Sequence, residues 1–322
     1  MSKAAHPPMG GVITLDALPP HLADGVVAIG NFDGVHRGHQ AVLSAALSGG
    51  RPTVGLTFEP HPREFFSNAP IFRLTPPQEK ARVMAALGLD GMVVVPFDAD
   101  LARHSAEDFV AEVLVERLRA REVVVGYDFK FGAKRRGDGA LLIREGARHG
   151  FATRIIEPCS DGGVISSTRI REHLTLGDVT AAAHLLGRRY TVVAKVRHGE
   201  KRGREMGYPT ANQALEPANA LRHGIYAVRL EIDGVWRGGV ASFGRRPTFD
   251  NGAPLLESFV FDYSGDLYGR PLRVAFERYL RPEIAFSGMD ALVAQMDRDS
   301  DDARNALEGL APFSAVDAAL NF

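Results

Sequence analysis

The most informative stretch of the sequence is Gly30-Asn31-Phe32-Asp33-Gly34-Val35-His36-Arg37-Gly38-His39. It follows the apolar run Val26–Ile29 and precedes a helix-like run over residues 40–47. A strand, a glycine-rich turn and a helix in this order aim backbone N–H groups and the positive end of a helix dipole at one point. The two imidazoles, three residues apart, would lie on one helical face. Surface histidines at this spacing are common, but the glycines and the preceding strand favour a phosphate site.

Strand-like and helix-like runs alternate between about residues 26 and 157. We expect strands at residues 26–29, 53–58, 92–96, 122–126 and 153–156, and helices near residues 38–48, 76–87, 105–118 and 140–149. Ser105 followed by Asp108 predicts a helix N-terminus, and Gly88 and Gly150 predict helix ends. The valines in the third and fourth strands are continuous, which is typical of strands buried on both faces. The alternation predicts an α/β fold with a doubly wound parallel sheet, whose ligands bind at the carboxyl ends of the strands.

The pattern changes after residues 185–189, Leu-Leu-Gly-Arg-Arg. Strand-like runs follow at residues 190–196, 225–232, 235–243, 256–261 and 272–279, and a helical region follows at about residues 289–310. Asp233-Gly234 between two of these runs predicts a tight hairpin. We therefore expect the second half to form a small antiparallel barrel or sandwich with a terminal helix. The expected domains are residues 1–186 and 187–322.

The composition limits the class of protein. The chain has 322 residues, of which 45% are hydrophobic and 24% charged, as in soluble globular proteins with room for two domains. A formal net charge of −1 disfavours nucleic acid as a partner. A single cysteine, Cys159, excludes an intrachain disulfide and a multi-cysteine zinc site. The N-terminus lacks an apolar signal region and no later run would span a bilayer, so we expect no membrane partner and a cytoplasmic location. The oligomeric state is left open, a homo-oligomer included.

Three more segments fall at the ends of expected strands in the first half. They are Phe58-Glu59-Pro60-His61-Pro62, Gly126-Tyr127-Asp128-Phe129-Lys130-Phe131-Gly132 and Ile165-Ser166-Ser167-Thr168-Arg169-Ile170-Arg171. Taken alone, they indicate a turn, a pair of core aromatic residues and a helix cap. Hydroxyls, free N–H groups and an arginine at one helix start also form an anion site. Their common position at the rim of the sheet, with the two histidines, favours binding.

Together these segments resemble the signatures of bacterial FAD synthetases, bifunctional enzymes that phosphorylate riboflavin and then adenylylate FMN. The resemblance implies a Rossmann-like nucleotidyltransferase domain in which His36 and His39 donate to the α-phosphate of ATP. The FMN phosphate attacks that phosphorus in line and pyrophosphate leaves, so donors that meet developing charge carry the catalysis. The outer phosphates of ATP would bind Ser167, Thr168 and Arg171.

The resemblance assigns two further groups of residues in the first half. The nucleotide would also contact Gly30, Asn31, Phe32 and Asp33. The flavin would contact Phe58, Pro60, His61, Asp128, Phe129 and Phe131, and Asn31 and Asp128 would help to shape the pocket. Two alternatives remain open for Lys134-Arg135-Arg136, namely a solvated loop and a contact with the FMN phosphate.

A second glycine-rich and basic stretch covers residues 198–212, His-Gly-Glu-Lys-Arg-Gly-Arg-Glu-Met-Gly-Tyr-Pro-Thr-Ala-Asn. It lacks the Gly-Lys-Ser/Thr end of a P-loop, and its spacing alone predicts a mobile hairpin loop. Its form resembles the riboflavin kinase signature. The resemblance implies that amides of the loop, with Gly199, Gly203 and Gly207, cover the ATP phosphates. It also implies that Thr210 and Asn212 position the ATP phosphates and Mg²⁺, which prefers hard oxygen ligands.

A kinase that acts on an alcohol also needs a proton acceptor. Glu257 lies in an otherwise apolar strand-like run, where an edge-strand charge is the ordinary explanation. The resemblance continues through residues 262–269 and 280–283 and implies that Glu257 is the base for the ribityl 5′-hydroxyl. Residues 243–249, Phe-Gly-Arg-Arg-Pro-Thr-Phe, are a variant of a family motif in which Phe243 replaces a smaller residue.

The resemblance covers about residues 22–310 and implies a bifunctional riboflavin kinase and FMN adenylyltransferase with a C-terminal β-barrel kinase domain. ATP and Mg²⁺ serve both reactions, riboflavin and FMN are the other substrates, and FMN and FAD are the products. A nucleotidyltransferase for another acceptor, such as phosphopantetheine, would not explain the second half. A non-catalytic sensor would not need to retain His36, His39, Asn212 and Glu257. An RNA-binding module would need a basic surface with aromatic residues.

Overall fold

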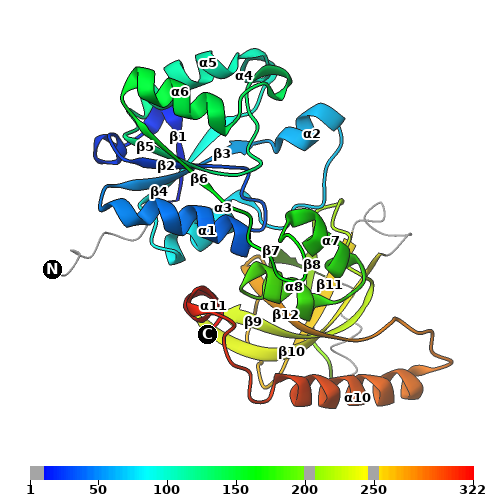
Figure 1. Ribbon diagram of the computed structural model, residues 1–322. Helices are drawn as coiled ribbons and strands as arrows, with labels where there is room; N and C mark the ends of the chain where they lie inside the picture. Colours follow the sequence, from blue (N-terminus) through cyan, green and yellow to red (C-terminus); the bar gives the residue numbers. More distant parts are fainter. Residues whose placement is uncertain (1–10, 199–206, 246–253) are drawn as a thin grey trace. The chain divides into compact units, whose positions relative to one another are not determined.

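The computed structural model describes residues 11–198, 207–245 and 254–322. The chain divides into two compact units, Met1–Ile71 with Thr75–Ser167, and Phe72–Leu74 with Thr168–Phe322. Each unit has a sheet of its own (Figure 1). The boundary expected between domains 1–186 and 187–322 stays a prediction about which parts of the chain fold alone.

The first unit has a six-stranded parallel sheet in the order β1-β4-β3-β2-β5-β6. The strands are β1 Val12–Thr14, β2 Val26–Ile29, β3 Thr53–Glu59, β4 Gly91–Pro96, β5 Glu122–Gly126 and β6 Ala152–Ile156. All five expected strands are present, and the doubly wound parallel sheet is confirmed. The edge strand β1 was not expected, because three residues carry too little pattern to indicate a strand.

Helices cover both faces of this sheet (Figure 1). One face carries α1 (Arg37–Ala46) and α3 (Pro77–Ala86), and the other carries α6 (Gly139–His149), α5 (Ala106–Asp108) and a π-helix (Phe109–Arg117). The strand residues Val27, Val54 and Val123 pack with Phe109 and Leu142 in one layer of the core. Shorter segments are α2 (Pro62–Ser67), α4 (Ala99–Arg103) and the 3₁₀ turns Leu15–Ala17, Pro20–Leu22, Leu47–Gly49 and Ala133–Arg135.

The helix expected at residues 105–118 is present in a different form. Its N-terminus has the expected cap, because the Asp108 N–H donates to Ser105 Oγ over 3.0 Å and the Asp108 carboxylate accepts from the Ser105 N–H over 3.3 Å. The backbone then continues as a π-helix, which apolar spacing does not distinguish from an α-helix. The helix ends predicted at Gly88 and Gly150 are confirmed by left-handed φ angles of 95° and 83°.

The strand order reverses at β2, which lies between β3 and β5. The chain passes from β2 to β3 and β4 on one side, and then crosses to β5 and β6 on the other. Ligands of open parallel sheets bind at the carboxyl ends of the strands at such a reversal. Residues 30–39 follow β2 and residues 126–132 begin at the end of β5, so two of the four segments singled out in the sequence flank this position.

The second unit is built on a closed antiparallel barrel in the order β10-β11-β8-β7-β12-β9. The strands are β7 Tyr190–Arg197, β8 Thr210–Ala214, β9 Gly224–Ile232, β10 Val235–Arg245, β11 Pro254–Val260 and β12 Pro271–Arg281. The helices are α7 (Ser167–Thr175), α8 (Val179–Leu186), α10 (Met289–Leu307) and α11 (Ala315–Asn321). Of the two architectures expected, the barrel is confirmed, with α10 as the expected helix. The hairpin at Asp233 and Gly234 is confirmed, with φ angles of 52° and 77°.

Three elements of the second unit were not expected from the sequence: α8, β8 and α11. The strand β8 begins within the stretch of residues 198–212 for which spacing alone predicts a mobile loop, so that prediction is wrong for residues 210–212. The short helix α11 is held by one buried cluster. The Asp317 carboxylate accepts the Arg189 backbone N–H over 3.0 Å and pairs with the Arg189 guanidinium, and both side chains are almost fully buried.

Candidate active sites

The turn that follows β2 has an unusual backbone. Phe32 and Val35 have positive φ angles of 48° and 40°, and both side chains are buried. A positive φ is rare for a residue with a β-branched side chain. Backbone strain of this kind persists only where the surrounding structure holds it, and it is concentrated at functional sites.

Hydrogen bonds from three separate segments of the chain hold this turn. The buried Asp33 carboxylate accepts from the Thr75 N–H over 3.1 Å, and the Asp33 carbonyl accepts from the Ser167 hydroxyl over 2.8 Å. The Gln40 side chain donates to the Val35 carbonyl over 2.9 Å. Asp33 and Ser167, which the family resemblance assigns to nucleotide binding, are therefore in direct contact.

The two histidines lie together where the turn enters α1. His36 is the N-cap, and its Nδ1 accepts from the His39 backbone N–H over 3.3 Å. Because Nδ1 accepts, the neutral ring carries its proton on Nε2, which can donate to a ligand. The two rings stack with centroids 3.6 Å apart, and the rings of Phe32 and His39 meet edge to face with centroids 5.4 Å apart. The expectation that both imidazoles lie on one face is confirmed.

Burial and neighbouring positive groups act on His39. Burial is the largest cause that lowers the pKa of His39 well below 6.5, followed by the charges of His36 and Lys80. The imidazole is therefore neutral at pH 7. Among the described residues, none forms a hydrogen bond with the buried Nδ1 of His39. A buried polar atom without a hydrogen bond destabilises the folded chain. A bound ligand is one group that could form this hydrogen bond.

The residues assigned to the flavin differ in burial. Phe58 and Phe131 belong to the hydrophobic core, and Phe129 packs against that core with its ring stacked on Phe131 at 5.4 Å. His61 is buried as the N-cap of α2, where its Nδ1 accepts from the Arg63 N–H over 3.1 Å. The exposed residues of the group are Pro60 and Asp128. Flavin contact with these six residues stays a prediction.

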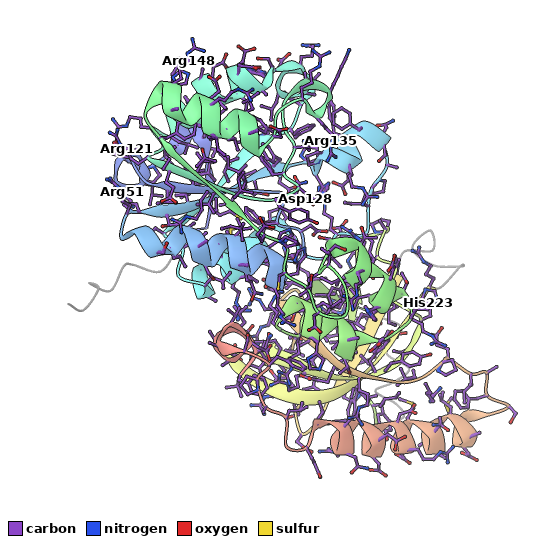
Figure 2. The ribbon with its side chains drawn as sticks, viewed as in Figure 1. Arg51, Arg121, Asp128, Arg135, Arg148 and His223 are labelled. Carbon is purple, nitrogen blue, oxygen red and sulfur yellow. The ribbon has the colours of Figure 1, made fainter. Side chains whose placement is uncertain are left out.

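The segment after β5 presents polar side chains to solvent. Asp128 and Arg135 are both exposed and are labelled in Figure 2. Lys134 and Arg135 have positive φ angles of 56° and 57°. Lys134, Arg135 and Arg136 are all exposed, as in the solvated-loop alternative, and contact with the FMN phosphate stays untested.

The Ser-Ser-Thr segment lies at the N-terminus of α7. Ser167 belongs to the first unit, whereas Thr168 and Arg171 belong to the second. The Arg171 Nε donates to the Phe72 carbonyl over 2.6 Å within the second unit. The start of a helix at Ser167 is confirmed, and the phosphate contacts of these three residues stay predictions.

The kinase residues form a row across three barrel strands. Glu257 of β11 is paired with Asn212 of β8 and with Ser242 of β10. Directly paired residues of antiparallel strands project from the same face, with Cβ atoms about 4.5–5.5 Å apart. Because β11 has a neighbour on each side of a closed barrel, the edge-strand explanation for Glu257 is wrong. Asn212 and Glu257, 45 positions apart in the chain, are brought together by the register.

Thr210 lies two residues before Asn212 and projects from the same face of β8. The Asn212 side-chain nitrogen donates to the Thr210 carbonyl over 3.2 Å and to its hydroxyl over 3.5 Å. The amide oxygen of Asn212 is therefore the end that can face a ligand. Gly207 has a left-handed φ of 81°, while Gly199 and Gly203 lie outside the described residues.

The remaining positions of the kinase motifs are only partly described. Phe243 is fully buried with its ring 5.6 Å from His223, which Figure 2 labels. Residues 246–249 of the variant motif lie outside the described residues.

The sequence did not indicate two charged residues near these sites. Lys80 is buried in α3 and donates to the Asn31 carbonyl beneath the histidine turn over 2.9 Å. Glu283 follows β12 and accepts from the Ser242 hydroxyl over 3.4 Å, next to the Glu257 row. Lys80 lies in the helix expected near residues 76–87, and Glu283 lies in the motif at residues 280–283. No sequence pattern indicates which elements these two side chains contact.

Residues 11–198, 207–245 and 254–322 contain no group of three or more histidine, cysteine, aspartate or glutamate side chains that could hold a metal ion. None of the helices in these ranges is both long and apolar enough to cross a membrane.

Fold and site together define a two-domain class, with a nucleotide-type site on a parallel sheet and a polar row on a closed barrel. The FAD synthetase family profile matches residues 18–169, and the riboflavin kinase profile matches residues 186–307. The chain belongs to the family of bifunctional riboflavin kinase/FMN adenylyltransferases.

Proteins of known family are similar in sequence to this chain over most of its length. The bifunctional riboflavin kinase/FMN adenylyltransferase of Escherichia coli K12 is 40% identical over 289 residues, which is 87% of this chain and 91% of the relative. That of Pseudomonas fluorescens is 38% identical over 291 residues, 88% and 94% of the two chains. A solved structure described as a macrolide-efflux protein from Streptococcus pneumoniae is 30% identical, covers 91% of this chain and 99% of its own, and has a TM-score of 0.80.

Proposed function

We propose that this chain phosphorylates riboflavin with ATP to give FMN, and then transfers AMP from a second ATP to FMN to give FAD and pyrophosphate. The observation that carries this proposal is the presence of two separate polar sites, each built from the residues of one family motif set. His36 and His39 stack at the entry of α1, and Asn212 and Glu257 are register partners in the barrel.

For adenylyl transfer, an oxygen of the FMN phosphate forms a bond to the α-phosphorus as the bond to pyrophosphate breaks. The Nε2–H of His36 and the ring of His39 would donate to the oxygens on which charge develops. The amides at the start of α1 add the positive end of the helix dipole. Ser167, Thr168 and Arg171 would hold the departing phosphates, and the residues assigned to the flavin would hold FMN.

For phosphorylation, the Glu257 carboxylate would accept the proton of the ribityl 5′-hydroxyl as that oxygen attacks the γ-phosphorus and ADP leaves. Glu257 lies on β11, which is paired with β8 and β10 in the closed barrel. This pairing fixes the position of the carboxylate relative to Asn212. Loop amides around Gly207 would cover the ATP phosphates.

Thr210 and Asn212 would hold Mg²⁺. Their hydroxyl and amide oxygens are hard ligands, and the amide nitrogen of Asn212 is already turned toward Thr210. Two neutral ligands leave most of the coordination to phosphate oxygens and water, which fits an ion that arrives with ATP. Mg²⁺ bound there would neutralise charge on the phosphates.

We also propose that the protein acts in the cytoplasm, because riboflavin, FMN and ATP are its expected small-molecule substrates.

The test is incubation of the purified full chain with riboflavin, ATP and Mg²⁺, followed by chromatographic separation of the flavins and measurement of pyrophosphate. FMN should appear first, and FAD should appear with an equal amount of pyrophosphate. Formation of neither flavin product, or of an adenylylated phosphopantetheine alone, would contradict the proposal.

A further inference from the structure

A buried ammonium group lies beneath the histidine turn. Lys80 is 2% exposed on α3, which packs against the sheet. Its Nζ donates to the Asn31 carbonyl over 2.9 Å and to Thr57 Oγ1 over 3.2 Å, and lies 3.7 Å from a carboxylate oxygen of Glu59. Thr57 itself donates to the Asn31 carbonyl over 3.0 Å. One backbone carbonyl of the turn is thus held from below by two side chains.

We propose that Lys80 is a positioning residue for adenylyl transfer, because its ammonium fixes the strained turn that carries His36 and His39 and places positive charge beneath the two imidazoles. This inference rests on the proposed function of the histidine site. It assigns a role to a residue of α3, outside every motif that the sequence analysis singled out.

The turn needs such support because its backbone is strained. Phe32 and Val35, with left-handed φ angles, lie between the Asn31 carbonyl and the His36 cap. Without a fixed anchor at Asn31, relaxation of these two residues would move the imidazoles. A displacement of about 1 Å at a catalytic group costs about 10²-fold in rate.

Packing alone does not require a charge at this position. Burying an ammonium is expensive, and an apolar side chain of similar length would fill the same space at lower cost. Glu59, about a fifth exposed, lies 3.7 Å from the ammonium and offsets part of that cost. Charged groups retained against such a cost are concentrated at functional sites.

The charge of Lys80 also acts on His39. It is one of the three causes that lower the pKa of His39, after burial and the charge of His36. Other charged groups near the turn include the carboxylate of Glu59, which pairs with Lys80, and that of Asp33, which accepts from Thr75. The guanidinium of Arg37, between the two histidines in the sequence, pairs with Asp161 over 2.5 Å. Positive charge here favours the neutral imidazole and stabilises negative charge on the α-phosphate above it.

The test uses full-length variants assayed for both reactions. Lys80→Met removes the charge and keeps the length, Lys80→Arg keeps the charge, and Arg82→Met removes a half-buried positive charge from the same helix as a matched control. We expect Lys80→Met to lower kcat for FMN adenylylation by about 10²-fold with little change in KM. Lys80→Arg should recover much of this loss, and Arg82→Met should behave as wild type.

Two further readouts separate positioning from general stability. In an NMR titration, with the His39 resonance assigned by its loss in His39→Ala, the pKa of His39 should rise in Lys80→Met. Riboflavin phosphorylation in the same samples should be unchanged. Wild-type adenylylation in folded Lys80→Met, an unchanged pKa of His39, or equal losses in Lys80→Arg and Lys80→Met would each overturn the proposal.

A milder variant keeps the test decisive if Lys80→Met does not fold. Thr57→Val removes one partner of Lys80 and one donor to Asn31 while it conserves shape. The loss of such hydrogen bonds should lower adenylylation by about tenfold, and an unchanged kcat would overturn the proposal. Failure of the wild-type chain to adenylylate FMN at all would instead refute the proposed function.

Discussion

Two substitutions, one in each unit, should separate the two reactions. Glu257→Gln keeps the shape of a side chain that lies between Asn212 and Ser242 in the barrel, so the register should survive. It removes the basicity that accepts the 5′-hydroxyl proton. Loss of a general base costs about 10²–10⁴ in rate, or about 3–5 kcal/mol of transition-state stabilisation. FAD synthesis from supplied FMN should be unchanged.

The complementary variant is His39→Ala. It removes a ring that stacks on His36 at 3.6 Å, and with it a donor to the developing charge at the α-phosphate. One donor of this type contributes about 10²–10³ in rate. Riboflavin should therefore still be converted to FMN, while FMN accumulates instead of FAD. Because the two residues lie in different units, the effects in the double variant should add.

The assay measures initial rates with riboflavin or FMN supplied separately, and flavins are separated by chromatography. Thermal melts must first show that both variants are folded, since loss of both activities could otherwise reflect instability. The reasoning is refuted if folded Glu257→Gln fails to adenylylate FMN, or if folded His39→Ala fails to phosphorylate riboflavin.

Four further predictions follow from particular contacts. Asp317→Asn should destabilise the protein by about 3–5 kcal/mol in chemical denaturation, because it leaves the buried Arg189 without its full countercharge. Chelation of Mg²⁺ should stop both reactions, and excess Mg²⁺ should restore them, as followed by flavin chromatography. A fragment that begins at Arg188 should fold and phosphorylate riboflavin. A fragment that begins at Thr168 should have a higher melting temperature in calorimetry than the Arg188 fragment, because it retains the buried face of α8. A folded Arg188 fragment that binds riboflavin without phosphorylating it would contradict the prediction of an independent kinase domain. The pKa of His39 is lowered in the folded chain, so near pH 6.5 the unfolded chain takes up a proton that the folded chain does not. The Tm of the wild type, measured relative to that of His39→Ala, should therefore fall as the pH drops below 6.5.

The sequence predicted the parallel sheet and the position of the histidines because both depend on local pattern. Continuous valines indicated strands buried on two faces, and a glycine-rich turn between a strand and a helix indicated the carboxyl edge of the sheet. The stacking of His36 on His39 also follows from spacing along one helix. These features need no knowledge of distant residues.

Features that depend on the register of paired strands or on burial in the core could not be predicted from local sequence pattern. Nothing local to Glu257 indicates that it pairs with Asn212, because the pairing is fixed by closure of the barrel. The motif around Phe131 indicates a pair of core aromatic residues, but not that Phe131 lies in the core while Phe129 lies at its edge. Lys80 appears in the sequence as one charge in a helix, where a solvated face is the ordinary expectation, and only the packing of α3 places it beneath the turn.

The two sites differ in what fixes their geometry, and this difference predicts where each is sensitive to change. Glu257 and Asn212 are fixed by hydrogen bonds between strands, so their spacing depends on the barrel as a whole and little on neighbouring side chains. His36 and His39 lie after a strained turn that is fixed by individual side chains, namely Asp33, Lys80 and Ser167. We expect the loss of any one of these contacts to leave the sheet intact and to free the turn. Adenylyl transfer should therefore be impaired by conservative substitutions at the polar positions that hold the turn, including Lys80, which has no assigned substrate contact, whereas phosphorylation should tolerate comparable substitutions around the barrel row.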